Sequence, residues 1–258
     1  MVSAVLFVLG LAAVSTVEAT HTWGSYHWAR TSNPFTLKLG DNVTTAWDST
    51  LAQTSTDWSA STVLDTTIVP GNVGNPKRCT PTAGRVEVCD DRYGFNGWLG
   101  VASIWASGSH ITQGTVKLND SYFNTTSYNT PAWRNLVSCQ EVGHTFGLAH
   151  QDENFSNSNL GTCMDYTNDP STNQHPNQHD YDELGIIYSH TDSTTTISAS
   201  TTSGNARSSA AAASCGDEHG IPPQAKPSDG DVFVCDLGNG QLRITHVFWI
   251  PPGLPGAR

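Results

Sequence analysis

Five residues between positions 140 and 150 have the types and spacing to hold and use one metal ion: Gln140, Glu141, His144, Gly147 and His150. On a helix, residues four apart share a face, so Gln140 and His144 project together and Glu141 lies one step round. Gly147 lets the chain leave the helix sharply and return His150 as a third ligand. Three protein ligands on zinc leave a fourth position for water, whose pKa the metal lowers to about 7. Glu141 could take that water's proton as it attacks a carbonyl and pass it to a leaving amine, which is peptide-bond hydrolysis.

A second short stretch follows at Cys163-Met164-Asp165-Tyr166. Together the two stretches resemble the metzincin clan of zinc peptidases, and within it the matrixin- and gametolysin-like members. The pattern of that clan is H-E-x-x-H-x-x-G-x-x-H with a downstream methionine turn. The resemblance covers about residues 34–190, and its matching positions are Glu141, His144, Gly147, His150 and Met164. It implies one catalytic Zn²⁺, a helix that forms the floor of a cleft, and Met164 beneath the metal.

Tyr166 is the further catalytic candidate that the resemblance implies. Astacin-like and serralysin-like members of the clan have a tyrosine two residues after the methionine. By that similarity the Tyr166 hydroxyl is expected to stabilise the oxyanion that develops in the reaction. A buried structural tyrosine is the alternative.

Gln140 stands where the pattern has its first histidine. An amide oxygen is a neutral but weaker ligand than imidazole, and three outcomes are open. Gln140 ligates the metal through its oxygen, it only hydrogen-bonds beside a two-histidine site, or the chain binds without cutting. Gametolysin-like members include Q-E-x-x-H, and the intact Glu141 favours catalysis. We therefore expect a secreted zinc-dependent endopeptidase, with a catalytically impaired metzincin-like binding protein as the alternative.

Hydrophobic periodicity predicts the elements that position these residues. Strands are expected at 35–39, 63–69, 84–88, 98–106 and 114–119, and a first helix at 44–60. Thr130 followed by Pro131 is a helix start signal, so the helix that carries the motif should span 131–146 and end at Gly147. A last helix is expected at 179–188. Strands, one early helix, more strands and two late helices describe an α+β domain.

Four segments divide the chain. Residues 5–14 are apolar and too short to span a bilayer, and Val17, Glu18 and Ala19 follow as a cleavage-site pattern. We therefore expect a signal peptide at 1–19, with a buried strand as the alternative. The catalytic domain should span 20–190. Residues 191–213 hold twelve Ser or Thr and a run of four Ala, and are interpreted as a linker.

Residues 214–258 are expected to form a small β-hairpin segment, with strands at 231–235 and 241–250. Leu242 and Ile244 alternate with Arg243 and Thr245, and His246 continues the spacing of the first pair. Forty-five residues bury too little surface to be robust alone. The segment is therefore either an appendage stapled by a disulfide or a tail that packs on the main domain.

Six cysteines in a secreted chain favour disulfides, for which 15 pairings are possible. Their spacing suggests three consecutive local pairs: Cys79–Cys89, Cys139–Cys163 and Cys215–Cys235. The residues around Cys79 superficially resemble the matrixin cysteine switch. Since strands and a helix of the domain precede Cys79, a disulfide is the better interpretation. The second pair would tie the active-site helix to the methionine turn, which the clan's fold places in contact.

The charge composition limits the kinds of partner that the chain can bind. The formal net charge is −11 without basic runs, so nucleic acid and anionic membranes are poor partners. A protein or peptide substrate and a monomer are expected. Four N-x-S/T sequons suit an extracellular glycoprotein: Asn42, Asn119, Asn124 and Asn154.

A second metal site is a weaker expectation. His175 and His179 with Asp180 could bind a structural Ca²⁺ or a second Zn²⁺, although a capped, solvent-facing helix start explains them more simply. His110, between two predicted strands, is ambiguous because one histidine does not make a site.

Overall fold

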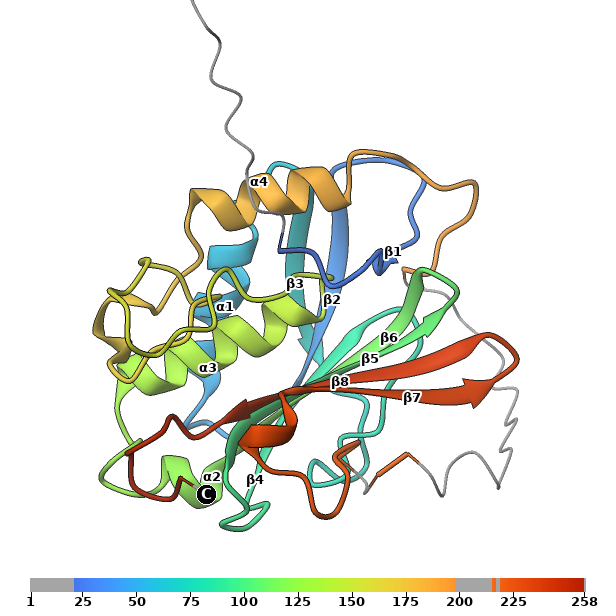
Figure 1. The fold of residues 1–258 in the computed structure, drawn as a ribbon. Helices are drawn as coiled ribbons and strands as arrows, with labels where there is room; N and C mark the ends of the chain where they lie inside the picture. Colours follow the sequence, from blue (N-terminus) through green and yellow to red (C-terminus); the bar gives the residue numbers. More distant parts are fainter. Residues whose placement is uncertain (1–20, 198–214, 217–218, 258) are drawn as a thin grey trace, which may run out of the picture.

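The computed structural model describes residues 21–197, 215–216 and 219–257 (Figure 1). The expected signal peptide and most of the expected linker lie outside the described residues. Residues 191–197 of that linker are described, and they lie against the N-terminal segment: Asp192 N donates to Arg30 O, and Thr196 N donates to Ala29 O.

One mixed sheet of eight strands organises the molecule. Its order is β3-β2-β4-β6-β5-β8-β7, with β1 paired to β6 beside this path. The strands β1 to β4 and β6 pair in parallel with one another. The strand β5 is antiparallel to β6, β8 is antiparallel to β5, and β7 is antiparallel to β8. Their bounds are His27–Trp28 (β1), Phe35–Asn42 (β2), Leu64–Pro70 (β3), Val86–Asp91 (β4), Trp98–Ser107 (β5), His110–Asn119 (β6), Val232–Gly238 (β7) and Gln241–Trp249 (β8).

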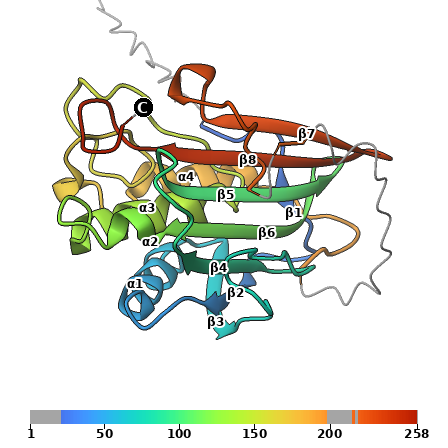
Figure 2. The same cartoon turned by 90° about the horizontal axis from the view of Figure 1, so that it is seen from below.

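The helices gather on one face of this sheet, as Figures 1 and 2 show. Trp133, Leu136 and Val137 of α3 are buried at helical spacing, and α3 contacts α1, β5, β6 and β8. The bounds are Asp48–Trp58 (α1), Asp120–Phe123 (α2), Pro131–His144 (α3) and Gln178–Ile187 (α4), with short 3-10 turns at Pro170–Thr172 (η1) and Pro227–Asp229 (η3).

The expected α+β class is confirmed, and each expected strand and helix is present with shifted ends. The first helix starts at Asp48 rather than 44 because Trp47 N bonds back to Thr44 O and Thr44 N is held by Asp90. The helix α3 starts as expected, since the Thr130 side chain accepts from Trp133 N and Pro131 follows the cap. The pattern did not predict β1 or α2, which are only two and four residues long.

The C-terminal segment packs on the main domain, which is the second of the two expected alternatives. Its hairpin β7–β8 extends the sheet, with β8 antiparallel to β5 from Trp98 opposite Trp249 to Ser107 opposite Gln241. This register sets His246 opposite Ala102. His246, although it is in the last strand of the chain, therefore lies on the side of the sheet that carries α3.

All three expected disulfides are present, and together they include all six cysteines. Cys79–Cys89 lies inside the domain as expected, and Cys139–Cys163 ties α3 to the residue before Met164. In the part of the chain that the structure describes, no helix is long and apolar enough to cross a bilayer.

The sequon residue Asn119 differs from the other three, because it is buried in the folded chain. Its side chain is fully buried, and its amide nitrogen donates to Gly94 O, Asn96 Oδ1 and Trp98 O. The amide therefore has no room for a glycan in the folded chain. Asn42 is partly buried and donates to Glu87, whereas Asn124 and Asn154 are exposed.

Candidate metal centre

The end of α3 positions the first two histidines. The helix stops at His144, and Gly147 takes the left-handed conformation, with φ +96°. A side chain at this position would also collide with the backbone, because a Cβ there would lie 2.2 Å from Tyr26 O. The glycine therefore allows the turn that returns His150 to His144, and the two rings lie 4.8 Å apart.

Three histidines converge at this point. Ligand nitrogens of His144, His150 and His246 all lie within 4.8 Å of one another, and all three residues are buried. His144 Nδ1 lies 2.8 Å from Leu148 O and must donate to it, which leaves Nε2 with a free lone pair. Among the described residues, neither His144 Nε2 nor His150 Nε2 has a hydrogen-bond partner.

His246 is the site residue that the motif did not predict. Its ring lies 3.7 Å from that of His144 and 4.5 Å from that of His150. Its Nδ1 is 3.7 Å from Glu141 Oε1, and its Nε2 is 3.4 Å from Asp231 Oδ2. The only signal for it in the sequence was its place in the alternation of the last strand.

Gln140 lies one turn before His144, and its amide has a defined orientation. Its Nε2 donates to Cys163 O at 2.6 Å. A carbonyl oxygen can only accept, so the amide nitrogen is the end that faces Cys163. The other end, Oε1, is buried and has no partner among the described residues. A free oxygen acceptor therefore accompanies the histidines.

Glu141 is fully buried on the adjacent side of the helix, and in the described chain neither of its oxygens has a hydrogen-bond partner. Burial raises the pKa of its carboxyl, and the contact with His246 opposes that shift. A carboxylate with a raised pKa is suited to accept and return a proton near neutral pH.

The three imidazoles differ in pKa. Burial, followed by repulsion from His246, lowers the pKa of His144 well below its usual value, and burial also lowers that of His150 to about 4. For His246, burial acts downward, but the contacts with Asp231 and Glu141 outweigh it and raise the pKa to about 9. His144 and His150 are therefore neutral, the form that binds metal, whereas a metal ion on His246 would displace its proton.

Met164 packs closely against α3 at Gly143. It is fully buried, and a Cβ on Gly143 would lie 2.8 Å from its Sδ and 2.6 Å from Trp58. Gly143, the residue before His144, therefore permits the methionine turn to approach the helix closely. The Cys139–Cys163 disulfide joins the same two segments.

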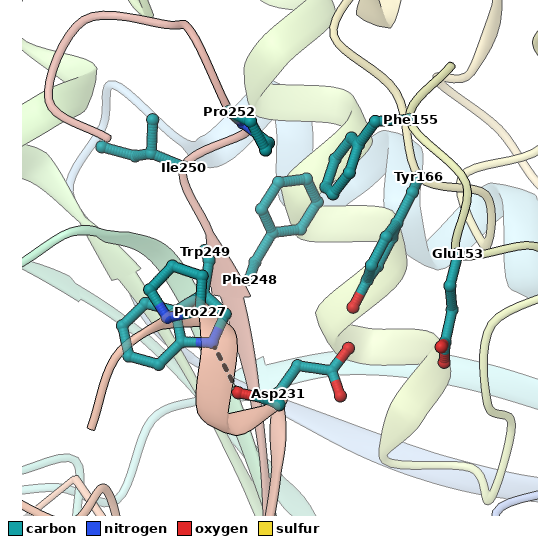
Figure 3. Close-up of a pocket in the computed structure, with 10 residues that line it drawn as sticks. Glu153, Phe155, Tyr166, Pro227, Asp231, Phe248, Trp249, Ile250 and Pro252 are labelled. Carbon is teal, nitrogen blue, oxygen red and sulfur yellow. Dashed lines mark hydrogen bonds between the residues drawn. The ribbon is translucent and has the colours of Figure 1, made fainter. Parts of the chain in front are cut away.

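Tyr166 lies beside His150, with ring centroids 4.2 Å apart, and stacks on Phe155. In Figure 3 its hydroxyl points toward the Asp231 carboxylate, at the edge of a cavity of ≈ 210 Å³. The walls of this cavity are largely apolar and come from the segment after His150 and from the C-terminal segment: Glu153, Phe155, Tyr166, Pro227, Gly230, Asp231, Phe248, Trp249, Ile250 and Pro252.

The donor set fits a zinc ion. Zinc prefers imidazole nitrogen with a few oxygen ligands, and buried polar atoms normally have partners. Here two ring nitrogens and one amide oxygen are buried and lack partners within the described chain. A divalent cation between them would satisfy all three.

The other expected cluster does not form a metal site. Asp180 completes a capping box with Asn177 at the start of α4 and contacts His21, while His179 stacks on His21. His175 pairs instead with Asp57, at 2.7 Å. The start of α4 is therefore capped as expected, but Asp180 is buried and does not face solvent.

No family model matches the sequence, and no curated protein matches it. Solved structures do match. One is high choriolytic enzyme 1, a hatching-enzyme zinc protease from the medaka fish Oryzias latipes, with a TM-score of 0.35 and 10% identity over 64% of this chain and 95% of that chain. Another is myroilysin, with a TM-score of 0.34 and 12% identity over 71% of this chain and 100% of that chain.

Proposed function

We propose that this chain is a zinc-dependent endopeptidase whose C-terminal hairpin holds the active site closed. One observation carries the proposal. Side-chain atoms of Gln140, His144 and His150 that can bind a metal are buried without partners in the described chain, next to the carboxylate of Glu141. Buried polar atoms normally have partners, so a metal ion that binds these atoms would account for them.

Gln140 Oε1, His144 Nε2 and His150 Nε2 would hold the ion. Bound zinc supplies Lewis-acid chemistry, which acidifies water and polarises a carbonyl. Glu141 takes the proton of the attacking water and returns it to the leaving amine.

Tyr166 donates its hydroxyl to the developing oxyanion. The substitution Tyr166→Phe keeps the ring beside His150 and removes only this hydroxyl. A fall in kcat of about 10²-fold with unchanged zinc content is expected. An unchanged kcat would leave Tyr166 a structural role only.

His246 closes the site. It contacts His144, His150 and Glu141, so it fills the space in which Glu141 would reach water and substrate. With His246 as a ligand, the ion has four protein ligands, which is typical of structural zinc sites, whereas catalytic sites keep one position open. Hydrolysis therefore requires the His246 side chain to leave the ion, either because the hairpin moves or because the side chain is removed.

The same movement uncovers the edge of β5. The strand β8 now satisfies this edge over most of its length. When β8 leaves, the freed N–H and C=O groups of β5 can pair with an extended peptide. A polypeptide in extended form is therefore the substrate class that this edge fits.

Hydrolysis of fluorescein-labelled casein by the zinc-loaded chain tests the proposal. His246→Ala should cleave faster than the wild type, because the substitution removes the closing side chain. The double variant His246→Ala/Glu141→Gln should be inactive with its zinc retained. An inactive His246→Ala chain that has folded and bound zinc would refute peptidase activity.

A second candidate is a secreted binding protein without catalysis. The complete burial of Glu141 beneath the hairpin favours it. In that case, neither His246→Ala nor cleavage of the chain within residues 198–214 would produce hydrolysis.

The proposed function includes secretion of the chain. The three disulfides suit an oxidising compartment, and two exposed sequons remain, at Asn124 and Asn154. Mass spectrometry of the protein from the culture medium should give an N-terminus near Thr20 and glycans at these two residues but not at Asn119. Retention of residues 1–19 would contradict the signal peptide.

A further inference from the structure

A second group of metal-binding side chains lies far from α3 in the sequence. It joins His27 of β1 to His190 and Asp192, which follow α4, and their ligand atoms all lie within 4.8 Å of one another. Figure 1 shows the chain after α4 returning beside β1. The geometry points to a second divalent metal site at His27, His190 and Asp192, which fastens these two segments together.

The distances between the ligand atoms suit a tetrahedral ion. His27 Nε2 is 3.2 Å from His190 Nε2 and 3.5 Å from Asp192 Oδ1, and the third edge, from His190 Nε2 to Asp192 Oδ1, is 3.8 Å. Zinc–nitrogen bonds of 2.0–2.1 Å in a tetrahedron place neighbouring ligand atoms about 3.3 Å apart. Shifts of a few tenths of an ångström would therefore complete the site.

Hydrogen bonds already orient two of the ligands. His27 Nδ1 lies 2.8 Å from Ser25 O and must donate to it, so Nε2 is the nitrogen left for the cluster. Asp192 Oδ2 accepts from Arg30 N and Arg30 Nη1, which leaves Oδ1 to face the histidines. Outer hydrogen bonds of this kind are typical of histidine and carboxylate metal ligands.

The chemistry of the facing atoms calls for a cation between them. Because Nδ1 donates to Ser25 O, His27 faces the cluster with Nε2, and Asp192 faces it with a carboxylate oxygen. Either a proton on a histidine or a metal ion could join the two atoms, and the experiment must separate these cases.

The donor types select the class of ion. Two imidazoles and one carboxylate suit zinc and its transition-metal neighbours, whereas Ca²⁺ and Mg²⁺ prefer oxygen ligands. The site is also open to exchange, since the side chain of His190 is 51% exposed. His110 lies at its rim, with Nε2 3.2 Å from Asp192 Oδ1.

The site would fix the segment that supports the end of α3. Trp23 N donates to Gly147 O, and Trp28 Nε1 donates to Thr145 O. His27 lies in the same segment as these two tryptophans. A metal that ties His27 to His190 and Asp192 would therefore stabilise the turn that follows His144.

Metal counting on the full chain tests the inference. Wild-type protein dialysed against zinc should hold two equivalents, and His190→Ala should hold one and unfold at a lower temperature in zinc. His175→Ala is the matched control, because His175 is 52% exposed, pairs with Asp57 and lies outside both clusters. It should hold two equivalents. Equal zinc content in His190→Ala and His175→Ala would overturn the inference and leave a hydrogen-bonded ion network.

A measurement on the wild-type chain removes any dependence on how the variants fold. Zinc-edge anomalous diffraction from zinc-loaded crystals should give a peak between His27 Nε2 and Asp192 Oδ1. The absence of that peak, with or without a peak beside His144, would also overturn the inference. The peak beside His144 reports separately on the proposed peptidase site.

Discussion

The two histidine clusters differ in how the chain builds them and in how they meet solvent. The first combines two histidines from one short motif with His246, and all three are buried. The second combines His27 with His190 and Asp192, and the side chain of His190 is half exposed. Burial with an adjacent carboxylate suits chemistry that must exclude water, whereas an exposed cluster that joins two segments suits a structural clamp.

Of the substitutions that separate the two clusters, Glu141→Gln should have the largest effect, and that effect is on hydrolysis. Glu141→Gln removes the proton acceptor and keeps the shape of the side chain, so hydrolysis by the His246→Ala chain should fall by about 10²–10⁴-fold. Zinc content should stay at two equivalents, because the residue ligates at neither cluster. Zinc analysis alongside the hydrolysis assay checks both statements, and loss of zinc would show that Glu141 holds the metal instead.

The protonation of His246 should make the free energy of unfolding depend on pH. Its folded-state pKa of about 9 lies above the usual value of 6.5. The folded state therefore binds this proton more tightly, so the contribution is complete below about pH 6.5 and is lost as pH rises toward 9. For the metal-free chain the loss amounts to about 3 kcal/mol of unfolding free energy.

Urea unfolding of the metal-free chain at pH 6.5 and pH 9 measures this loss. The difference between the two pH values should disappear in His246→Asn. Its persistence in that variant would assign the effect to another group. His190→Ala should keep the difference, which separates the two clusters.

Gly143→Ala should have the smallest effect. The new methyl group would press on Met164 and Trp58, and overpacking of this kind costs about 1–3 kcal/mol. Denaturant unfolding should show this loss, with zinc retention weakened at the first cluster and unchanged at the second. Gly185→Ala is the control, since no described atom lies within 4 Å of a Cβ there. A wild-type midpoint for Gly143→Ala would mean that the methionine turn can shift freely.

The sequence predicted most of the elements because their signals are local. The largely apolar run at 98–106 located β5, and Thr130 with Pro131 located the start of α3. Short elements such as β1 give no period to detect. Gln140, Glu141 and His144 were found because one helix turn fixes their mutual positions, and His150 was found because Gly147 marks the turn that returns it.

His246 could not be predicted because its position depends on which edge of the sheet receives the last hairpin. Nothing local in Gln241–Trp249 specifies that β5 is its partner. The second cluster could not be predicted from the sequence for the same reason, since β1 and the segment after α4 meet only in the folded chain. Spacing detects a site that one element carries, whereas a site assembled from distant segments requires the tertiary structure.

X-ray absorption at the zinc edge tests the central claim, closure of the first cluster by His246, most directly. One equivalent of zinc bound to the His190→Ala chain should show three imidazoles and one oxygen ligand. In the His190→Ala/His246→Ala chain, one imidazole should be replaced by oxygen. The same number of imidazoles in both chains would contradict the claim.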